Sequence, residues 1–282
     1  MATPMGDRNL QRQRSCLSVK SVVVSAVLVA GLAACGGGGP KTQRLDPVAS
    51  TGDVDAVLRL ADNLRDRGEL TYAIAMYQQA ASKTDDPAVL VKLGRALSAN
   101  GAIERAAGVF RRAVSKAPEY PDALLGLGTA YLQLGEIEKS IQYLDQVVKQ
   151  GKSTDLRRYL ALGAAYDLAG RHDEARVTYE AGLKIEPEHL DLKSNLALSH
   201  SINDRHDQAI KVMREVIESL DAQRAHQRNM VLILALAGRD REAVALGVRQ
   251  LGQSETQDVL TQASSARGRT SGAERARAIG AS

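Results

Sequence analysis

A residue suited to tight turns recurs about every 34 positions through most of the chain. The recurring positions are Gly68, Gly101, Gly135, Gly170 and Gly238, with Asn203-Asp204 in the one missing place. A period of this length is typical of repeat proteins, in which each unit buries its apolar face only against its neighbours. Each unit has room for two helices and a turn. We therefore expect an all-α solenoid of about six helical hairpins.

The composition agrees with helices that pack closely. Apolar residues make up 44% of the chain, which has a single Phe, no Trp and only seven Pro. Ala and Leu, which favour helices, recur throughout the sequence. The interfaces between helices are therefore expected to be built from small and aliphatic side chains.

The net charge of +4 depends on the N-terminal segment. Residues 1–34 contain Arg8, Arg12, Arg14, Lys20 and Asp7, and their removal leaves 33 basic and 32 acidic side chains. Nucleic-acid binding normally needs a basic surface, often with interleaved aromatic residues. A nearly neutral chain with few aromatic residues is not expected to bind nucleic acid.

The N-terminus has the organisation of a secretory signal. A positively charged segment is followed by an uncharged apolar stretch, residues 21–34, and by small residues. The stretch is shorter than the roughly 20 residues that a transmembrane helix needs. We therefore expect export rather than a permanent membrane span.

The sequence Leu32-Ala33-Ala34-Cys35 resembles the lipobox of bacterial lipoproteins. The resemblance implies that residues 1–34 are a signal peptide, that Cys35 carries acyl chains, and that several chains anchor the protein stably. Gly36 after the cysteine suggests the periplasmic face of the outer membrane. The alternative is an ordinary signal peptide. In either case Cys16 leaves with the signal, so no disulfide is expected within the mature chain.

Residue composition divides the rest of the chain. Residues 35–52, rich in Gly and Pro, are expected to form a flexible tether behind the lipid. The solenoid is predicted over residues 54–257, with units that start near 54, 87, 121, 156, 190 and 224. Residues 258–282 are expected to complete a capping segment, Thr256 to Ala266, and to end in a disordered tail from Arg267.

Within the units, small and large residues recur at fixed offsets that resemble the tetratricopeptide repeat. The small eighth position reads Ala61, Gly94, Gly128, Gly163 and Ala197, with Val231 as an exception. The small twentieth position reads Ala73, Ala106, Ser140, Ala175, Ala209 and Ala243. The large twenty-fourth position reads Tyr77, Phe110, Leu144, Tyr179 and Met213, with Gly247 as an exception. This resemblance implies a right-handed superhelix that binds protein.

No residue pattern indicates an enzyme, a cofactor or a metal site. The sequence Gly151-Lys152-Ser153-Thr154 ends like a phosphate-binding loop, but it lacks the first glycine and the preceding strand that such a loop needs. His172 and His206 occupy the same repeat position and have no metal-ligand spacing, so they are expected to be capping or surface groups. We therefore expect a non-enzymatic protein without cofactor or bound metal.

In tetratricopeptide repeats the first helices line the concave face. The corresponding positions are polar in the first two units and become apolar toward the C-terminus. The predicted apolar groove contains Leu125, Leu132, Leu160, Leu168, Leu198, Ile202, Leu232 and Leu236. Such a groove suits an amphipathic helix or an apolar strand. Some of these side chains belong to the core instead if the helical phase is wrong by one position, which rotates a side chain by about 100°.

The lipobox, the tether, the six repeats and residues 227–251 together resemble the TadD lipoproteins of the tight-adherence, or Flp, pilus system. The resemblance implies a pilotin-like scaffold whose partner is the outer-membrane secretin that exports the pilus. The alternative is a repeat lipoprotein that serves as an adaptor for cell-wall hydrolases or for the assembly of outer-membrane proteins.

Overall fold

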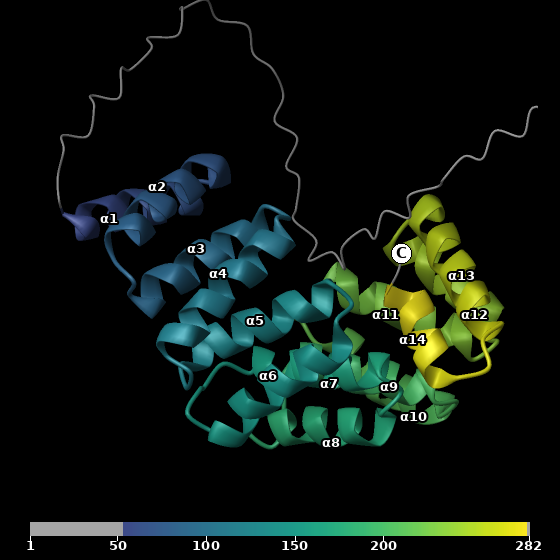
Figure 1. The fold of residues 1–282 in the computed structure, drawn as a ribbon. Coiled ribbons are helices and arrows are strands. Elements are labelled where there is room, and N and C mark those ends of the chain that lie inside the picture. The colour runs from purple at the N-terminus through teal and green to yellow at the C-terminus, as the bar shows by residue number, and fades with distance from the viewer. Residues whose placement is uncertain (1–52, 281–282) are drawn as a thin grey trace, which may run out of the picture.

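The computed structural model of the chain describes residues 53–280, which form fourteen helices and no strand. The first twelve helices pair into six hairpins that follow one another around an arch (Figure 1). The first helices of the hairpins are α1 (Val54–Asp66), α3 (Pro87–Ala99), α5 (Pro121–Gln133), α7 (Arg157–Leu168), α9 (Leu190–Ile202) and α11 (Arg224–Leu236). These helices begin within one residue of the predicted unit starts.

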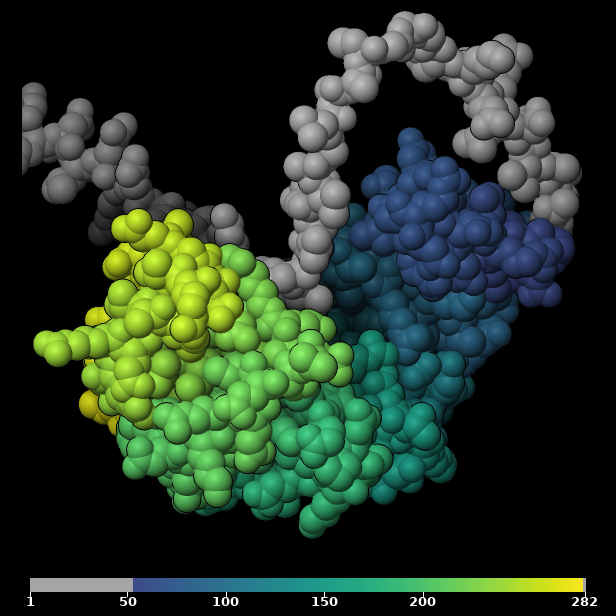
Figure 2. All heavy atoms as spheres, turned by 180° about the vertical axis from the view of Figure 1, so that it is seen from behind, coloured from purple at the N-terminus to yellow at the C-terminus, as the bar shows by residue number. Residues whose placement is uncertain are grey.

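The second helices are α2 (Leu70–Lys83), α4 (Ile103–Lys116), α6 (Ile137–Gln150), α8 (His172–Leu183), α10 (His206–Glu218) and α12 (Asp240–Gln250). Two further helices, α13 (Gln253–Arg267) and α14 (Gly272–Gly280), follow the last hairpin. Seen from behind, the hairpins pack in sequence order, with the purple N-terminal end and the yellow C-terminal end on opposite sides (Figure 2). The fold is a superhelical solenoid.

The turn inside every hairpin uses a left-handed residue. The five recurring glycines have φ between 73° and 79°, and Asp204 takes the same place with φ 60°. Asp is among the few residues other than Gly that tolerate this conformation. Of the pair Asn203-Asp204, it is therefore Asp204 that replaces the glycine.

Close packing within a hairpin explains the small eighth position. A Cβ atom on Gly94 would lie 2.6 Å from Phe110 Cε1, and one on Gly128 would lie 2.6 Å from Leu144 Cγ. Gly163 has the same relation to Tyr179. In these three hairpins the large residue at position twenty-four fills the space that the missing side chain leaves.

The last hairpin reverses this pairing. Val231 is large where the other hairpins have Gly or Ala, and Gly247 is small where they have a large residue. A Cβ on Gly247 would lie 2.6 Å from Thr256 Cγ2, because α13 packs against α12 at this point. The small residue at position twenty-four of the last hairpin therefore leaves room for the capping helix α13.

The core is continuous along the solenoid. One cluster of buried side chains extends from α1 to α5, a second from α5 to α9, and a third from α9 to α13. Neighbouring clusters share a helix, so each hairpin is stabilised mainly by the hairpins before and after it, as in other repeat proteins.

The C-terminal end differs from the sequence prediction. A disordered tail from Arg267 was expected because the segment is rich in Gly, Ser, Ala and Arg, but residues 272–280 form the helix α14. The expectation is wrong there because α14 packs against α13, α7 and α9. The predicted signal peptide, Cys35 and the tether all lie outside the described residues. Within residues 53–280 no helix combines the length and the apolar character that a membrane span requires.

Candidate binding surface

The first helices of the hairpins form the inner face of the arch. Each of α5, α7, α9 and α11 contacts the first helix of the hairpin before it, whereas among residues 53–280 the second helices have no comparable contacts with one another. Helices on the inside of a curve lie closer together than those on the outside. The surface that a ligand would meet inside the arch is therefore built by first helices.

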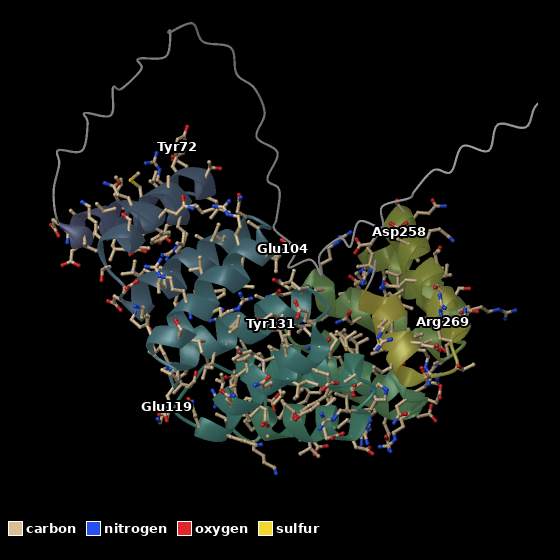
Figure 3. The ribbon with its side chains drawn as sticks, viewed as in Figure 1. Tyr72, Glu104, Glu119, Tyr131, Asp258 and Arg269 are labelled. Atoms are coloured by element: carbon tan, nitrogen blue, oxygen red, sulfur yellow. The ribbon has the colours of Figure 1, made fainter. Side chains whose placement is uncertain are left out.

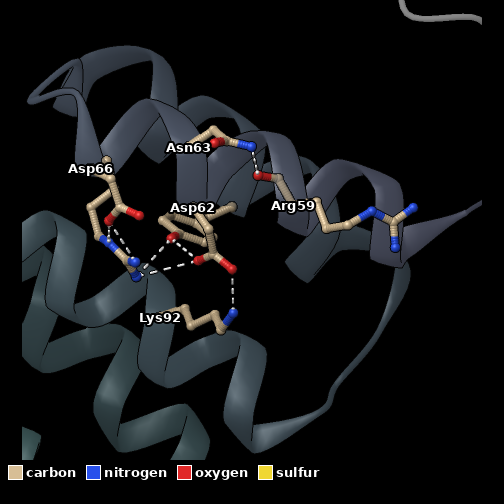
Figure 4. A network of polar contacts seen from close by, with 7 residues as sticks. Arg59, Asp62, Asn63, Asp66 and Lys92 are labelled. Carbon is tan, nitrogen blue, oxygen red and sulfur yellow. Dashed lines mark hydrogen bonds and ion pairs between the residues drawn. The ribbon is translucent and has the colours of Figure 1, made fainter.

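At the N-terminal end this face is polar, as the sequence predicts (Figure 4). Asp62 on α1 accepts hydrogen bonds from Tyr77 Oη at 2.5 Å and from Lys92 Nζ at 2.7 Å, and Arg65 Nη1 lies 3.3 Å from the same carboxylate. Arg65 also pairs with Asp66. Asp62 thus links α1 to both α2 and α3.

The charge state of Asp62 follows from these contacts. Partial burial favours the protonated acid, but the hydrogen bonds from Lys92 and Tyr77 outweigh it and lower the pKa of Asp62 below its ordinary value. Burial and the hydrogen bond to Asp62 raise the pKa of Tyr77. At neutral pH the pair is therefore an ionised carboxylate and a neutral phenol, which joins the first hairpin to the second.

The eight apolar residues predicted to line the groove fall into two groups. Four of them are half-buried, and these are Leu132, Leu160, Leu168 and Leu198. The other four are buried, and these are Leu125, Ile202, Leu232 and Leu236. Only the half-buried group offers side chains that a partner on the inner face can contact.

The prediction is therefore wrong for the buried group. Leu125 packs in the middle core cluster, and Leu232 and Leu236 pack in the C-terminal one. Leu232 is only 1% exposed because α13 packs against both α11 and α12 and covers the face that the repeat pattern predicts to be free. Ile202 is buried at the end of α9, where α14 approaches.

A buried polar cluster lies at the C-terminal end of α7, and the sequence did not indicate it. The carboxylate of Asp167 accepts hydrogen bonds from Ser199 Oγ at 2.8 Å and Tyr179 Oη at 3.2 Å, and His172 Nδ1 lies 2.8 Å from it. Burial and the Asp167 charge raise the pKa of Tyr179 well above its ordinary value. The cluster joins α7, α8 and α9.

The arrangement of this cluster is structural. Ser199 and His172 both bind Asp167 and are not paired with each other, whereas a catalytic serine needs a base within hydrogen-bond distance. His172 is buried, so the expectation of a surface group is wrong for it. Asp167 occupies position twelve of the fourth unit, and no other unit has Asp at that position. The repeat pattern therefore contains no signal for the cluster.

Two other histidines also have local partners, whereas the buried Nδ1 of His200 has none within the described residues. His226 Nδ1 accepts from the Gln223 amide at 3.0 Å and caps α11, and His206 Nδ1 lies 3.1 Å from Ser201 Oγ. Within the described part of the chain, no three His, Cys, Asp or Glu side chains gather as metal ligands would.

Comparison with protein families agrees with the geometry. Three tetratricopeptide-repeat models match the chain, at residues 58–121, 97–166 and 156–189, and none of them describes an enzyme family. The hairpins beyond residue 189 continue the same turn geometry, with Asp204 and Gly238 in the left-handed conformation.

Solved structures of other repeat proteins share the fold. A tetratricopeptide repeat protein from Parabacteroides merdae is 14% identical, covers 80% of this chain and 97% of its own, and superposes with a TM-score of 0.60. MamA from Desulfovibrio magneticus is 23% identical, and the match covers 60% of this chain and 96% of MamA with a TM-score of 0.54. YrrB, described as having an unusual peptide-binding site, is 21% identical. The match covers 67% of this chain and 92% of YrrB, with a TM-score of 0.51.

Two curated proteins resemble parts of the chain. The CTR9 homolog of Arabidopsis thaliana is 25% identical over 129 residues, which is 45% of this chain and 12% of that protein. The BBSome member BBS4 of Bos taurus is 29% identical over 90 residues, which is 32% of this chain and 17% of that protein. The chain thus spans less than a fifth of either relative.

Proposed function

Because residues 58–189 belong to the tetratricopeptide-repeat family, we propose that this chain is a lipid-anchored, protein-binding scaffold that assists the outer-membrane secretin of a tight-adherence pilus. Its solenoid holds a segment of the secretin on the inner face. Its acyl chains on Cys35 keep it at the periplasmic face of the outer membrane. It performs no chemistry on its partner.

The observation that carries the proposal is the row of half-buried leucines on the inner face. Leu132, Leu160 and Leu198 lie on three successive first helices, and each packs at the edge of a core cluster while keeping part of its side chain accessible. Accessible apolar side chains on a rigid concave surface are suited to the apolar face of a partner segment. Burying a fully exposed leucine contributes about 1.5–3 kcal/mol, and each of these half-buried side chains can contribute a part of that to binding.

The anchor and the pilus role rest on two resemblances in the sequence. Leu32-Ala33-Ala34-Cys35 is similar to a lipobox. Residues 227–251, which are similar to the C-terminal part of TadD lipoproteins, form most of α11 and all of α12. Most of α11 is buried, so the similar residues support the capping helix. The residues that select the partner lie elsewhere, on the inner face.

The test is genetic and uses the intact lipoprotein. Deletion of the gene should leave secretin multimers depleted from the outer membrane and cells without surface pili, and the wild-type gene should restore both. A Cys35→Ser gene should not restore them, because a chain without its lipid is not held at the membrane.

Two results would contradict the proposal. Secretin multimers and pili that are unchanged in the deletion strain exclude the pilotin role. Cell-wall hydrolases or outer-membrane assembly factors that copurify in place of the secretin identify the protein as an adaptor of another system.

A further inference from the structure

The short helix α14 turns back from the end of the solenoid onto the fourth and fifth hairpins. A four-residue turn that contains Arg269, labelled in Figure 3, separates it from α13. Its first residue, Gly272, lies against the buried His172: a Cβ there would lie 2.8 Å from His172 Cδ2 and closer still to Nε2. Its contacts reach α7 and α9, which are two first helices of the inner face.

Two arginines of α14 bind the C-terminal ends of these helices. Arg275 Nε donates to the Ile202 carbonyl at 2.7 Å, and its Nη2 donates to Asp204 at 2.8 Å. Arg277 Nη2 donates to the Leu168 carbonyl at 3.4 Å. Ile202 and Leu168 are the last residues of α9 and α7, so both carbonyls lack partners inside their own helices. Helix C-termini also carry partial negative charge, which favours bound guanidinium groups.

The apolar side of α14 packs against two of the first helices that carry the predicted groove. Ala276 is buried, and Ala278 and Ile279 pack against the same core cluster as Leu198. The Gln262 side chain of α13 donates to the Ile279 carbonyl. α14 thus occupies the inner face in the way that a bound amphipathic helix from a partner would.

The attachment of α14 is suited to release. A helix of nine residues with glycine at both ends is not stable alone in water, since isolated helices need about 12–15 residues even in favourable sequences. It is held by packing and by a few polar contacts. Arg275, whose side chain is 13% exposed, makes the shortest of those that reach the six hairpins. Because each hairpin is stabilised mainly by its neighbours, we expect loss of these contacts to unfold the segment and to leave the six hairpins folded.

We propose that α14 is a releasable latch, and that the surface beneath it is a docking site for a partner's amphipathic helix of the same chemistry. That helix carries two arginines two residues apart, which bind the ends of α7 and α9 and Asp204, and small or aliphatic residues that pack beside Leu198. The partner helix displaces α14 when it binds. This inference rests on the proposed scaffold function and adds the class of ligand and its regulation.

The test uses the full lipoprotein in detergent and a fluorescein-labelled peptide of residues 269–280 as the probe. Two variants open the latch by different means: Arg275→Glu with Ile279→Glu removes its contacts, and Gly272→Val forces its first turn away from His172. Both should bind the peptide at least tenfold more tightly than the wild-type chain, in which α14 competes. Circular dichroism should show that both retain the helical content of the six hairpins.

A charge change at the site supplies the matched comparison. In the open background, Asp204→Asn should weaken peptide binding at least fivefold, whereas Asp207→Asn, an exposed carboxylate on α10, should leave it unchanged. A peptide with Arg275 and Arg277 replaced by Ala should bind weakly to every variant.

Four results would overturn the latch. The peptide binds the wild type and both open variants equally, or it binds no folded variant, or Asp204→Asn has no effect. Light scattering that shows a dimer exchanging α14 between copies also overturns it, because α14 is then an assembly contact. None of these results bears on secretin localisation in the deletion strain, so the two proposals fail separately.

Discussion

Gly163 and Gly108 allow a direct test of the packing that defines the hairpins. Both glycines lie inside helices, on α7 and α4 respectively, and neither has a positive φ. Replacement by Ala removes the same backbone freedom at each, which favours folding by about 0.5–1 kcal/mol. Their surroundings differ: a Cβ on Gly108 meets no atom within 4 Å, whereas one on Gly163 lies 2.5 Å from Tyr179 Cζ.

The Tyr179 ring cannot yield easily. It is 2% exposed, and its hydroxyl donates to Asp167, which also holds Ser199 and His172. Overpacking costs about 1–3 kcal/mol, and a displaced ring also weakens a hydrogen bond to a charged group worth about 1.5–3 kcal/mol. After subtraction of the gain in helix propensity, Gly163→Ala should destabilise the protein by about 1.5–5 kcal/mol.

The assay is denaturant unfolding followed by circular dichroism, with thermal melting as a second measure. Gly163→Ala should lower the melting temperature by about 3 °C or more, since each kcal/mol shifts a domain of this size by about 2–4 °C. Gly108→Ala should raise it slightly. Gly163→Ala combined with Tyr179→Met reproduces the pair Ala197 and Met213 of the fifth hairpin. The double variant should therefore lose less stability than the sum of the losses in the two single variants.

A Gly163→Ala variant as stable as the wild type would refute the assigned pairing of positions eight and twenty-four. A Gly108→Ala variant that is equally destabilised would show that the loss at Gly163 has a cause other than the Tyr179 contact.

Three further predictions concern other parts of the chain. Cys35→Ser should give an unprocessed precursor without lipid label, and an intact mass that shows a mature N-terminus elsewhere without acyl chains would contradict it. Asp167→Ala should lower the free energy of unfolding by about 3 kcal/mol or more, because three buried donors lose their acceptor; Asp167→Asn, which keeps one acceptor oxygen, should cost less in the same denaturation assay. Burial, with smaller contributions from Arg176 and Arg205, lowers the pKa of His200 from its ordinary value of 6.5. The unfolded chain then binds more protons just below pH 6.5, so stability should fall as the pH drops through that range, and His200→Leu should reduce this fall. An unchanged pH profile in the His200→Leu variant would rule out this contribution.

The hairpins could be predicted because their determinants are local and repeated. Gly128 and Leu144 lie in one unit, and the same spacing recurs in the others, so a single sequence contains several copies of the pattern. The turn residues have a physical reason as well, because only a few residue types adopt the left-handed conformation. Even the replacement at Asp204 follows from this rule.

The inner face was harder to predict because its exposure depends on helices outside the repeat. The repeat pattern places Leu232 on the concave side, but α13 covers that side of α11. The composition of residues 267–282 suggests disorder, but contacts made by Arg275 more than 70 residues away in the sequence hold α14 in place. A periodic pattern contains no information about such distant contacts.

Site-specific photocrosslinking in cells tests the central claim most directly. A photoreactive residue at Leu160, on the inner face, is compared with one at Val177, an exposed apolar residue on the outer helix α8. With both variants expressed, lipidated and able to restore pili, the account predicts a covalent adduct with the secretin from position 160 and none from position 177. Equal adducts at both positions, an adduct only at 177, or no secretin adduct at 160 would contradict the claim that the inner face of this scaffold holds the secretin.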